Sequence, residues 1–201
     1  WIVSLTLGIK RDELNSDRLV FAKHQDIINK IVDERITGRP LWYCIGDTDF
    51  YGFTIKVDER VLIPRPETEL LVENALKYVN KECKVLDLCT GSGAIAIAVQ
   101  KKSCASVAAI DVSCDALKLA KENAELNSAN VEFIESDLFS EISDGTPRKF
   151  DVIISNPPYI RPDVISELES NVKDFEPYNA LCGGADGLLF YRRITSAIGD
   201  M

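Results

Sequence analysis

Residues 84–97 read KVLDLCTGSGAIAI, and the rest of the chain can be placed relative to them. The first half is a short apolar run, which predicts a buried strand, and the second half is rich in small apolar residues, which predicts the start of a helix. Gly91 and Gly93 lie in the turn between the two. Because glycine has no Cβ, these positions tolerate a positive φ and let a ligand approach the backbone. The unpaired N–H groups of the first helical turn add donors, so a nucleoside-type cofactor is expected here.

The glycine spacing in this turn selects among known cofactor patterns. The dinucleotide pattern GxGxxG needs glycines where Cys89 and Ala94 stand, and the Walker pattern needs a Gly-Lys-Ser/Thr that is absent. The remaining Asp-x-x-x-Gly-x-Gly resembles motif I of the S-adenosylmethionine-dependent methyltransferases, in which the position of Cys89 is often glycine. A strand, turn and helix without a ligand is the alternative. The resemblance assigns the cofactor to Asp87, Cys89, Thr90, Gly91, Ser92 and Gly93.

Composition limits the classes of function. The chain has 201 residues, 46% of them apolar and 27% charged, enough for one domain with a small appendage. A net charge of -9 argues against a protein that holds long DNA or RNA through its phosphates. No apolar run approaches the roughly 20 residues that span a bilayer, and no signal peptide is visible, so we expect a cytoplasmic protein, with no membrane contact. The six cysteines form no C-x-x-C pair, so no metal site is expected.

The pattern of residues along the chain predicts two unequal parts. Residues 1–40 are expected to form a partial helical lobe, because apolar positions recur at helical spacing over 17–35. Residues 41–61, with aromatic side chains around Gly46-Asp47, predict a hairpin linker. Residues 62–201 form the larger domain. Since the chain starts at Trp1 and its only methionine is Met201, we expect a fragment. We also expect a monomer.

The segment LIPRPETELL at 62–71 predicts a stiffened entry into a helix that runs to Tyr78. Thr68 or Glu67 is expected to cap this helix, and the dipole of the helix favours carboxylates in its first turn. Capping alone would explain Glu67.

Further apolar runs also end in acidic residues. The run 106–110 ends at Asp111, and the run 131–134 leads to Asp137 and Leu138. Strands that alternate with helices predict a parallel α/β sheet, whose ligands bind at the carboxyl ends of the strands. We expect Asp111 to bind ribose hydroxyls, and Asp137 to accept a hydrogen bond from an adenine amine while Leu138 covers the ring. The alternatives are an N-cap at Asp111 and a plain loop aspartate beside a core leucine.

The most specific motif follows the run 150–154 and reads Ser-Asn-Pro-Pro-Tyr. Two prolines fix φ and remove two donors, which leaves backbone carbonyls as acceptors. We expect the Asn156 side-chain oxygen and the Pro157 backbone oxygen to accept the two hydrogens of a planar NH2 group, while the Tyr159 ring limits its tilt. Orientation of this kind supplies roughly 7–11 kcal/mol. No base is needed before attack, which fits a chain whose only histidine, His24, lies in the helical lobe.

The combined motifs resemble the HemK/PrmC family, the protein-(glutamine-N5) methyltransferases that modify the Gly-Gly-Gln loop of class 1 peptide chain release factors. The resemblance covers nearly the whole chain and implies a Rossmann-like class I sheet. It further implies that the C-terminal strands are missing, because the family continues into further strands beyond Asp200-Met201. It also implies S-adenosyl-L-methionine as methyl donor and S-adenosyl-L-homocysteine as product. The matching segments are IPRPETE at 63–69, DLCTGSGAIAIA at 87–98, Asp111, NPPYI at 156–160 and EPYNALCGGADGL at 176–188.

The resemblance also implies roles for single residues. Besides the glycine turn, the cofactor would contact Asp111, Asp137, Leu138 and Asn156. Catalysis would rest on Asn156, Pro157 and Tyr159. The glutamine would be bound by Asn156, Pro157, Pro158 and Tyr159, with Arg65, Pro66 and Glu67 closing the pocket. The N-terminal helical lobe would hold the release factor.

Three other functions stay open on the sequence. Asn-Pro-Pro-Tyr also serves the glutamine methyltransferase of a ribosomal protein, which differs mainly in its N-terminal part, and adenine-N6 DNA methyltransferases. The acidic charge and the lack of a basic target-recognition region argue against a stable nucleic-acid partner. The third is a protein that holds the cofactor without transferring methyl, because the expected missing strands leave the sheet unfinished.

Overall fold

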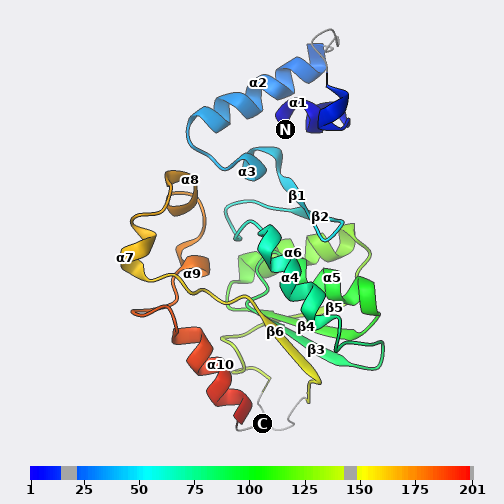
Figure 1. The fold of residues 1–201 in the computed structure, drawn as a ribbon, viewed down its shortest axis with the longest axis vertical. Helices are drawn as coiled ribbons and strands as arrows, with labels where there is room; N and C mark the ends of the chain where they lie inside the picture. The colour runs from blue at the N-terminus through cyan, green and yellow to red at the C-terminus, as the bar shows by residue number, and fades with distance from the viewer. Residues whose placement is uncertain (15–21, 143–148, 200–201) are drawn as a thin grey trace.

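Figure 1 shows a computed structural model of the chain, which describes residues 1–14, 22–142 and 149–199. Helices at the N-terminal end lead through a short hairpin into a larger α/β part. The last helix of the described residues, α10 (Leu189–Gly199), lies beside the sheet of that part (Figure 1).

The N-terminal part is helical, as predicted. It consists of α1 (Ile2–Leu7), the short 3-10 helix η1 (Arg11–Glu13), α2 (Ala22–Ile36) and α3 (Leu41–Ile45). The predicted start of the second helix falls on residues 15–21, which lie outside the described residues. The rings of Trp1 and Trp42 meet edge to face, with centroids 5.9 Å apart, and this contact joins the beginning of the chain to α3.

Residues 41–61 contain a hairpin, but the segment begins with helix α3 rather than with a strand, and the turn lies elsewhere than expected. Strands β1 (Asp47–Phe50) and β2 (Phe53–Lys56) pair antiparallel. Tyr51 and Gly52 connect them with φ of 54° and 81°, as a two-residue turn of type I′ requires. Gly46, which we expected near the turn, has a φ of 97° and ends α3 instead. Both positions offer a glycine, and local sequence does not say which one closes a helix and which one reverses a strand.

Within the described residues, a parallel sheet of four strands forms the centre of the larger part, and the predicted parallel α/β sheet is confirmed. Its strands are β3 (Lys84–Leu88), β4 (Ser106–Asp111), β5 (Val131–Glu135) and β6 (Val152–Ser155), in the order β5-β4-β3-β6. Because the chain passes from β3 outward to β5 and then returns to the other side of β3, the order reverses beside β3. A crevice at the carboxyl ends of the strands is expected at such a point.

Helices cover both faces of this sheet (Figure 1). On one face, α4 (Pro66–Ala75), α5 (Ala94–Ser103) and α6 (Cys114–Leu126) pack in a core that includes Val85 of β3. On the other face, Leu86 and Leu88 pack with Ile194 of α10 (Leu189–Gly199). Successive side chains of β3 therefore enter opposite cores, which explains its unbroken apolar run.

The helix predicted from 62–71 begins at Pro66 and ends at Ala75, not at Tyr78. Its N-cap is Arg65, without a side-chain cap bond, so neither Glu67 nor Thr68 caps it. The reason is that proline lacks an N–H and has a preset φ, so Pro66 fits the first helical position and places Glu67 and Thr68 within the first turn.

Three short helices precede α10. They are α7 (Pro162–Ile165), α8 (Ser170–Lys173) and α9 (Tyr178–Leu181), and they lie beside the carboxyl ends of the strands (Figure 1). Asp200 and Met201, where we expected the sheet to break off, lie outside the described residues.

Candidate active site

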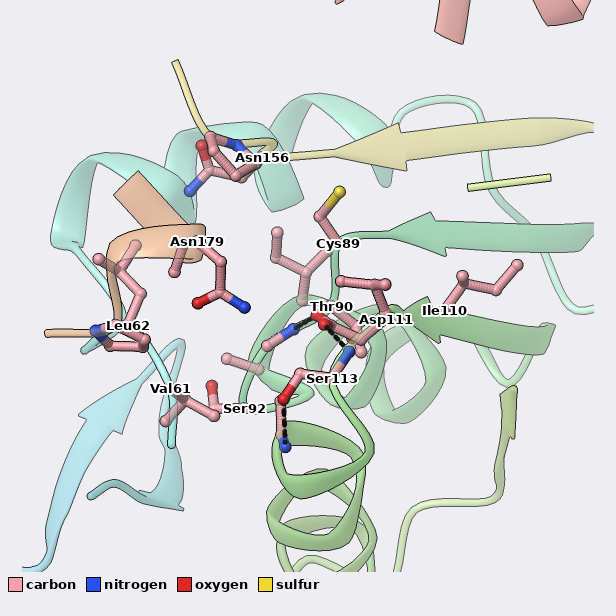
Figure 2. Close-up of a pocket in the computed structure, with 18 of the residues that line it drawn as sticks. Val61, Leu62, Cys89, Thr90, Ser92, Ile110, Asp111, Ser113, Asn156 and Asn179 are labelled. Atoms are coloured by element: carbon pink, nitrogen blue, oxygen red, sulfur yellow. Dashed lines mark hydrogen bonds between the residues drawn. The ribbon is translucent and has the colours of Figure 1, made fainter. Parts of the chain in front are cut away.

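A pocket opens at the carboxyl ends of β3, β4 and β6 (Figure 2). Its walls come from the glycine turn, from residues 111–113 and 136–138, from Asn156, and from the entry to α4. Residues that the sequence predicted at separate strand ends thus gather around one cavity.

The glycine turn has the predicted backbone. Gly91 and Gly93 have φ of 54° and 81°. A Cβ added to Gly93 would lie 3.1 Å from the Cβ of Ala120, so this glycine also lets α5 approach α6. Thr90 and Ser92, on either side of Gly91, are buried and line the pocket.

Asp87 lies behind the turn rather than in the pocket wall. Its side chain is fully buried, and its Oδ2 accepts a hydrogen bond of 2.6 Å from the Thr90 hydroxyl. Burial raises the pKa of Asp87 to about 7. Asp87 therefore supports the turn from beneath, and a direct contact between it and the cofactor stays a prediction.

Cys89 occupies a backbone position that suits glycine. Its φ is 61°, a left-handed conformation that costs a residue with a Cβ roughly 1–2 kcal/mol. The thiol lies at the pocket wall, and burial raises its pKa to about 12, so it stays protonated at neutral pH. The turn thus accommodates the bulkier residue by strain.

The Asp111 carboxylate is held by two backbone donors (Figure 2). The Gly91 N–H donates to its Oδ2 at 2.8 Å, and the Ser113 N–H donates to its Oδ1 at 2.9 Å. Ser113, not Asp111, caps α6, since its hydroxyl accepts a hydrogen bond from the Ala116 N–H. Each carboxylate oxygen accepts more than one hydrogen bond, so acceptor capacity remains for hydroxyl groups in the pocket. Burial raises the pKa of Asp111.

Leu138 and Asp137 lie beyond Asp111 in the same wall. Leu138 is buried with a φ of 55° and shares the pocket wall with Ile110. The Asp137 Oδ2 accepts a hydrogen bond of 2.9 Å from Arg193 of α10. Val112, which the sequence analysis missed, is 59% exposed and lines the pocket as well. Its position directly after Asp111, the acidic end of a predicted strand, could have indicated that it lines the pocket.

The Asn-Pro-Pro-Tyr corner begins where β6 is tied to β3. The Ser155 hydroxyl donates to the Leu88 carbonyl at 2.8 Å. The Asn156 Nδ2 donates to the Thr68 hydroxyl at 3.4 Å, and this arrangement leaves its Oδ1 as an acceptor. Asn156 and Gly91 line the same pocket, and Asn156 also lines a second pocket with Tyr159.

The second pocket lies on the outer side of the corner. Arg65, Thr68 and Leu62 line both pockets, as Asn156 does. Glu67 lines the second pocket, Pro158 lines the first, and neither Pro157 nor Pro66 is among the residues that line either one in the described part of the chain. The other residues of the second pocket are Leu71, Tyr159, Ile160, Leu168, Val172, Leu181 and Ala180, the last of which also lines the first pocket.

Arg65 is engaged by a residue that sequence reasoning missed. One nitrogen of Arg65, Nη2, donates to both carboxylate oxygens of Glu176, at 2.7 and 2.8 Å. The Glu176 side chain is 1% exposed. Burial raises the pKa of Glu176, and the Arg65 charge opposes that rise. The pair connects the start of α4 to the segment before α9, whose Asn179 lines the first pocket (Figure 2).

Within the described ranges, no group of three or more His, Cys, Asp or Glu side chains is arranged to hold a metal ion. None of the helices in that part of the chain has the length and apolar character needed to cross a bilayer.

Known proteins with similar sequences identify the family. Residues 66–169 match the Methyltransferase small domain family. The release factor glutamine methyltransferase of Lactococcus lactis subsp. lactis is 50% identical over 190 residues, which cover 94% of this chain and 67% of that protein. The enzyme of the same name from Thermodesulfovibrio yellowstonii is 44% identical over 200 residues, covering 96% of this chain and 71% of that protein. The chain belongs to the release factor glutamine methyltransferase family.

Membership in the release factor glutamine methyltransferase family confirms the predicted enzyme class and the predicted methyl donor, S-adenosylmethionine. A solved 16S rRNA methyltransferase from T. thermophilus, in complex with AdoMet and guanosine, is 21% identical with a TM-score of 0.47. The match between the two structures covers 56% of this chain and 32% of the rRNA methyltransferase chain. The assignment therefore rests on the sequence relatives.

The pocket fits S-adenosylmethionine in three places. The glycine turn presents backbone at the start of α5, where a ligand can approach it closely. Asp111 presents oriented acceptors that suit ribose hydroxyls, and Leu138 with Ile110 and Val112 presents an apolar wall that suits a base.

Proposed function

We propose that this protein transfers a methyl group from S-adenosylmethionine to the side-chain amide nitrogen, N5, of the glutamine in the Gly-Gly-Gln loop of class 1 release factors. The observation that carries the proposal is the position of Asn156, which lines both pockets. A residue at that junction can contact a methyl donor on one side and an acceptor amide on the other. The names of the relatives support the choice of substrate.

In this proposal the first pocket holds the donor. The turn 89–93 contacts its amino-acid end, Asp111 binds its ribose hydroxyls, and Leu138 with Asp137 lies against its adenine. S-adenosylmethionine supplies an electrophilic methyl group on a sulfonium. The nucleophile is the amide nitrogen of the substrate glutamine, and the residues of this chain orient it toward the methyl group.

The second pocket takes the glutamine side chain. An amide nitrogen is a poor nucleophile because its lone pair is delocalised, so the protein must orient it. The Asn156 Oδ1 accepts one amide hydrogen, and Tyr159 limits the tilt of the amide plane. The Pro157 carbonyl is the expected acceptor of the second hydrogen, although Pro157 does not line the pocket in this structure. Acceptors in these places also stabilise the positive charge that develops on nitrogen. The extra proton leaves after attack, so no base has to act beforehand.

The surroundings of the second pocket suit a protein loop as substrate. Tyr159 is 57% exposed, and the pocket wall mixes Leu71 and Leu168 with the charged Glu67 and Arg65. We infer that the helical lobe, residues 1–40, holds the body of the release factor, with 41–61 as linker and 62–201 as the methyltransferase domain. We further infer a cytoplasmic monomer that forms no stable complex with nucleic acid or membranes.

The test is methyl transfer from labelled S-adenosylmethionine to three purified candidates: a class 1 release factor, ribosomal proteins and DNA oligonucleotides. We expect label in the release factor only, and none when the glutamine of its Gly-Gly-Gln loop is replaced by alanine. Label in a ribosomal protein or in DNA would assign the site to one of the other substrates. Cofactor binding without transfer to any of the three would make the chain a binding protein.

A further inference from the structure

The segment 176–188, EPYNALCGGADGL, runs beside the Asn-Pro-Pro-Tyr corner and bonds to it through the backbone. The Ile160 N–H donates to the Leu181 carbonyl, and the Gly183 N–H donates to the Ile160 carbonyl, both at 2.9 Å. Ile160 and Cys182 form a parallel bridge. The chain after α9 therefore lies alongside the residues that follow the two prolines.

Two glycines let this segment lie directly against the corner. A Cβ added to Gly183 would lie 2.5 Å from the Tyr159 Cα and 2.8 Å from the Pro158 carbonyl oxygen. A Cβ added to Gly187, whose φ is 77°, would lie 2.4 Å from the Tyr159 carbonyl oxygen. Cβ atoms essentially never come this close to other atoms. The contact is backbone on backbone, and any other residue at these positions must push the corner away.

The corner needs support of this kind because of its own sequence. Pro157 and Pro158 have no N–H, so the corner cannot be fixed by donors of its own at those positions. In the described part of the chain, the backbone bonds that hold it to another segment begin at Ile160. The Pro157 carbonyl must remain available to a substrate, so the support has to come from the side opposite the substrate.

The other end of the segment is also anchored. Glu176 is held by Arg65 at the start of α4, and between the two anchors α9 contributes Asn179 and Ala180 to the wall of the first pocket. A shift of the glycine end would therefore be transmitted to the corner directly, while the cofactor wall keeps its second attachment at Glu176.

We propose that Gly183 and Gly187 are positioning residues for the glutamine site, because the backbone they expose fixes Pro158 and Tyr159 at the distance and angle that methyl transfer needs. The inference rests on the proposed function. Ordinary contact begins at 3.4 Å, so Gly183→Ala requires Tyr159 to move by about 0.9 Å, which is 3.4 minus 2.5. A misplacement of about 1 Å in a reacting geometry lowers the rate roughly 100-fold.

The experiment compares Gly183→Ala and Gly187→Ala with wild type and with Gly52→Ala. Gly52 has a φ of 81°, close to that of Gly187, but no atom lies within 4 Å of an added Cβ, so it controls for backbone strain alone. Cofactor affinity is measured by calorimetry, and kcat and KM for the release factor are normalised to the fraction of protein that binds cofactor. We expect a fall in kcat of about 100-fold for the two site variants. We also expect cofactor dissociation constants close to wild type and an unchanged kcat for Gly52→Ala.

The outcomes separate this inference from the proposed function. An inactive wild-type protein that binds cofactor would refute the proposed function before any variant is compared. With an active wild type, an unchanged normalised kcat in both glycine variants would overturn the positioning role. Failure of both variants to fold, or equal losses of cofactor binding and turnover, would also overturn it, because the contact would then serve stability in general.

Discussion

We predict that Arg65→Ala destabilises the protein more than Glu176→Gln, although both changes break the same ion pair. Removing Arg65 leaves a carboxylate whose side chain is 1% exposed without its cation, and breaking a buried pair in this way costs about 3–5 kcal/mol. Removing the Glu176 charge leaves a guanidinium that is 37% exposed and that water can solvate, so the loss is about 1 kcal/mol, as for a surface pair. The expected difference is at least about 2 kcal/mol in the free energy of unfolding.

The stability cost of each variant should also depend on pH. Burial raises the pKa of Glu176 and Arg65 opposes the rise, so the pKa is higher still in Arg65→Ala. A carboxyl whose pKa is raised in the folded state binds more protons there than in the unfolded state. Stability therefore increases as the pH falls through the folded pKa. The cost of Arg65→Ala should shrink between about pH 8 and about pH 5. The cost of Glu176→Gln should instead grow over the same range, because this variant lacks the proton that folded wild-type Glu176 takes up.

Urea unfolding followed by circular dichroism at both pH values measures these costs, with the double variant included to test coupling. We expect the double variant to be less destabilised than the sum of the two single variants, because it leaves no unpaired charge. Equal costs for the two single variants, or a difference that does not change with pH, would refute the argument that burial of Glu176 dominates the pair.

Three further predictions concern the pocket. Asn156→Ala should abolish detectable methyl transfer while calorimetry finds only a modest rise in the cofactor dissociation constant; retained turnover would remove Asn156 from catalysis. Asp111→Ala should weaken cofactor binding by roughly 1.5–3 kcal/mol for each hydrogen bond lost, and an unchanged dissociation constant would exclude Asp111 from the ribose site. Burial raises the pKa of Asp87 from its ordinary value of 3.8 to about 7, so its native carboxyl holds a proton that the unfolded chain has lost. Wild-type stability should therefore fall as the pH rises between these values. Asp87→Asn should remove that part of the slope in chemical denaturation, and parallel pH profiles would contradict the assignment.

The sheet could be predicted because its signal is local. Each strand of a sheet covered on both faces is apolar throughout, and the runs at Val85 and Val107 have this property. The residues at the carboxyl ends followed from topology alone, since parallel strands bring their ends to one edge. This is why Asp111 and Asn156 could be assigned to one site although they are far apart in the chain.

The residues that begin and end helices and turns were harder to assign from the sequence. Gly46 and Gly52 both lie in the same aromatic-rich segment, but only the second reverses the hairpin, because the first closes α3. Thr68 resembles a capping residue, but Pro66 already defines the first turn of α4. Such choices depend on packing against the rest of the fold.

Contacts between residues that are far apart in the chain could not be predicted from the sequence. Nothing near Arg65 indicates that Glu176, 111 residues later, would bind it. The contact of Gly183 with Tyr159 depends on two segments that meet only in the folded chain. Asp87 also gave no sign that its side chain would face inward, because strand-end acids point to either face.

The most direct test of the central claim is peptide mass spectrometry of a class 1 release factor after incubation with this protein and S-adenosylmethionine. If Asn156 orients a carboxamide at the junction of the two pockets, one methyl group will be found on the side chain of the Gly-Gly-Gln glutamine. The Asn156→Ala variant will leave that peptide unmodified. A methyl group on any other residue, or an equally modified glutamine with Asn156→Ala, would contradict the account.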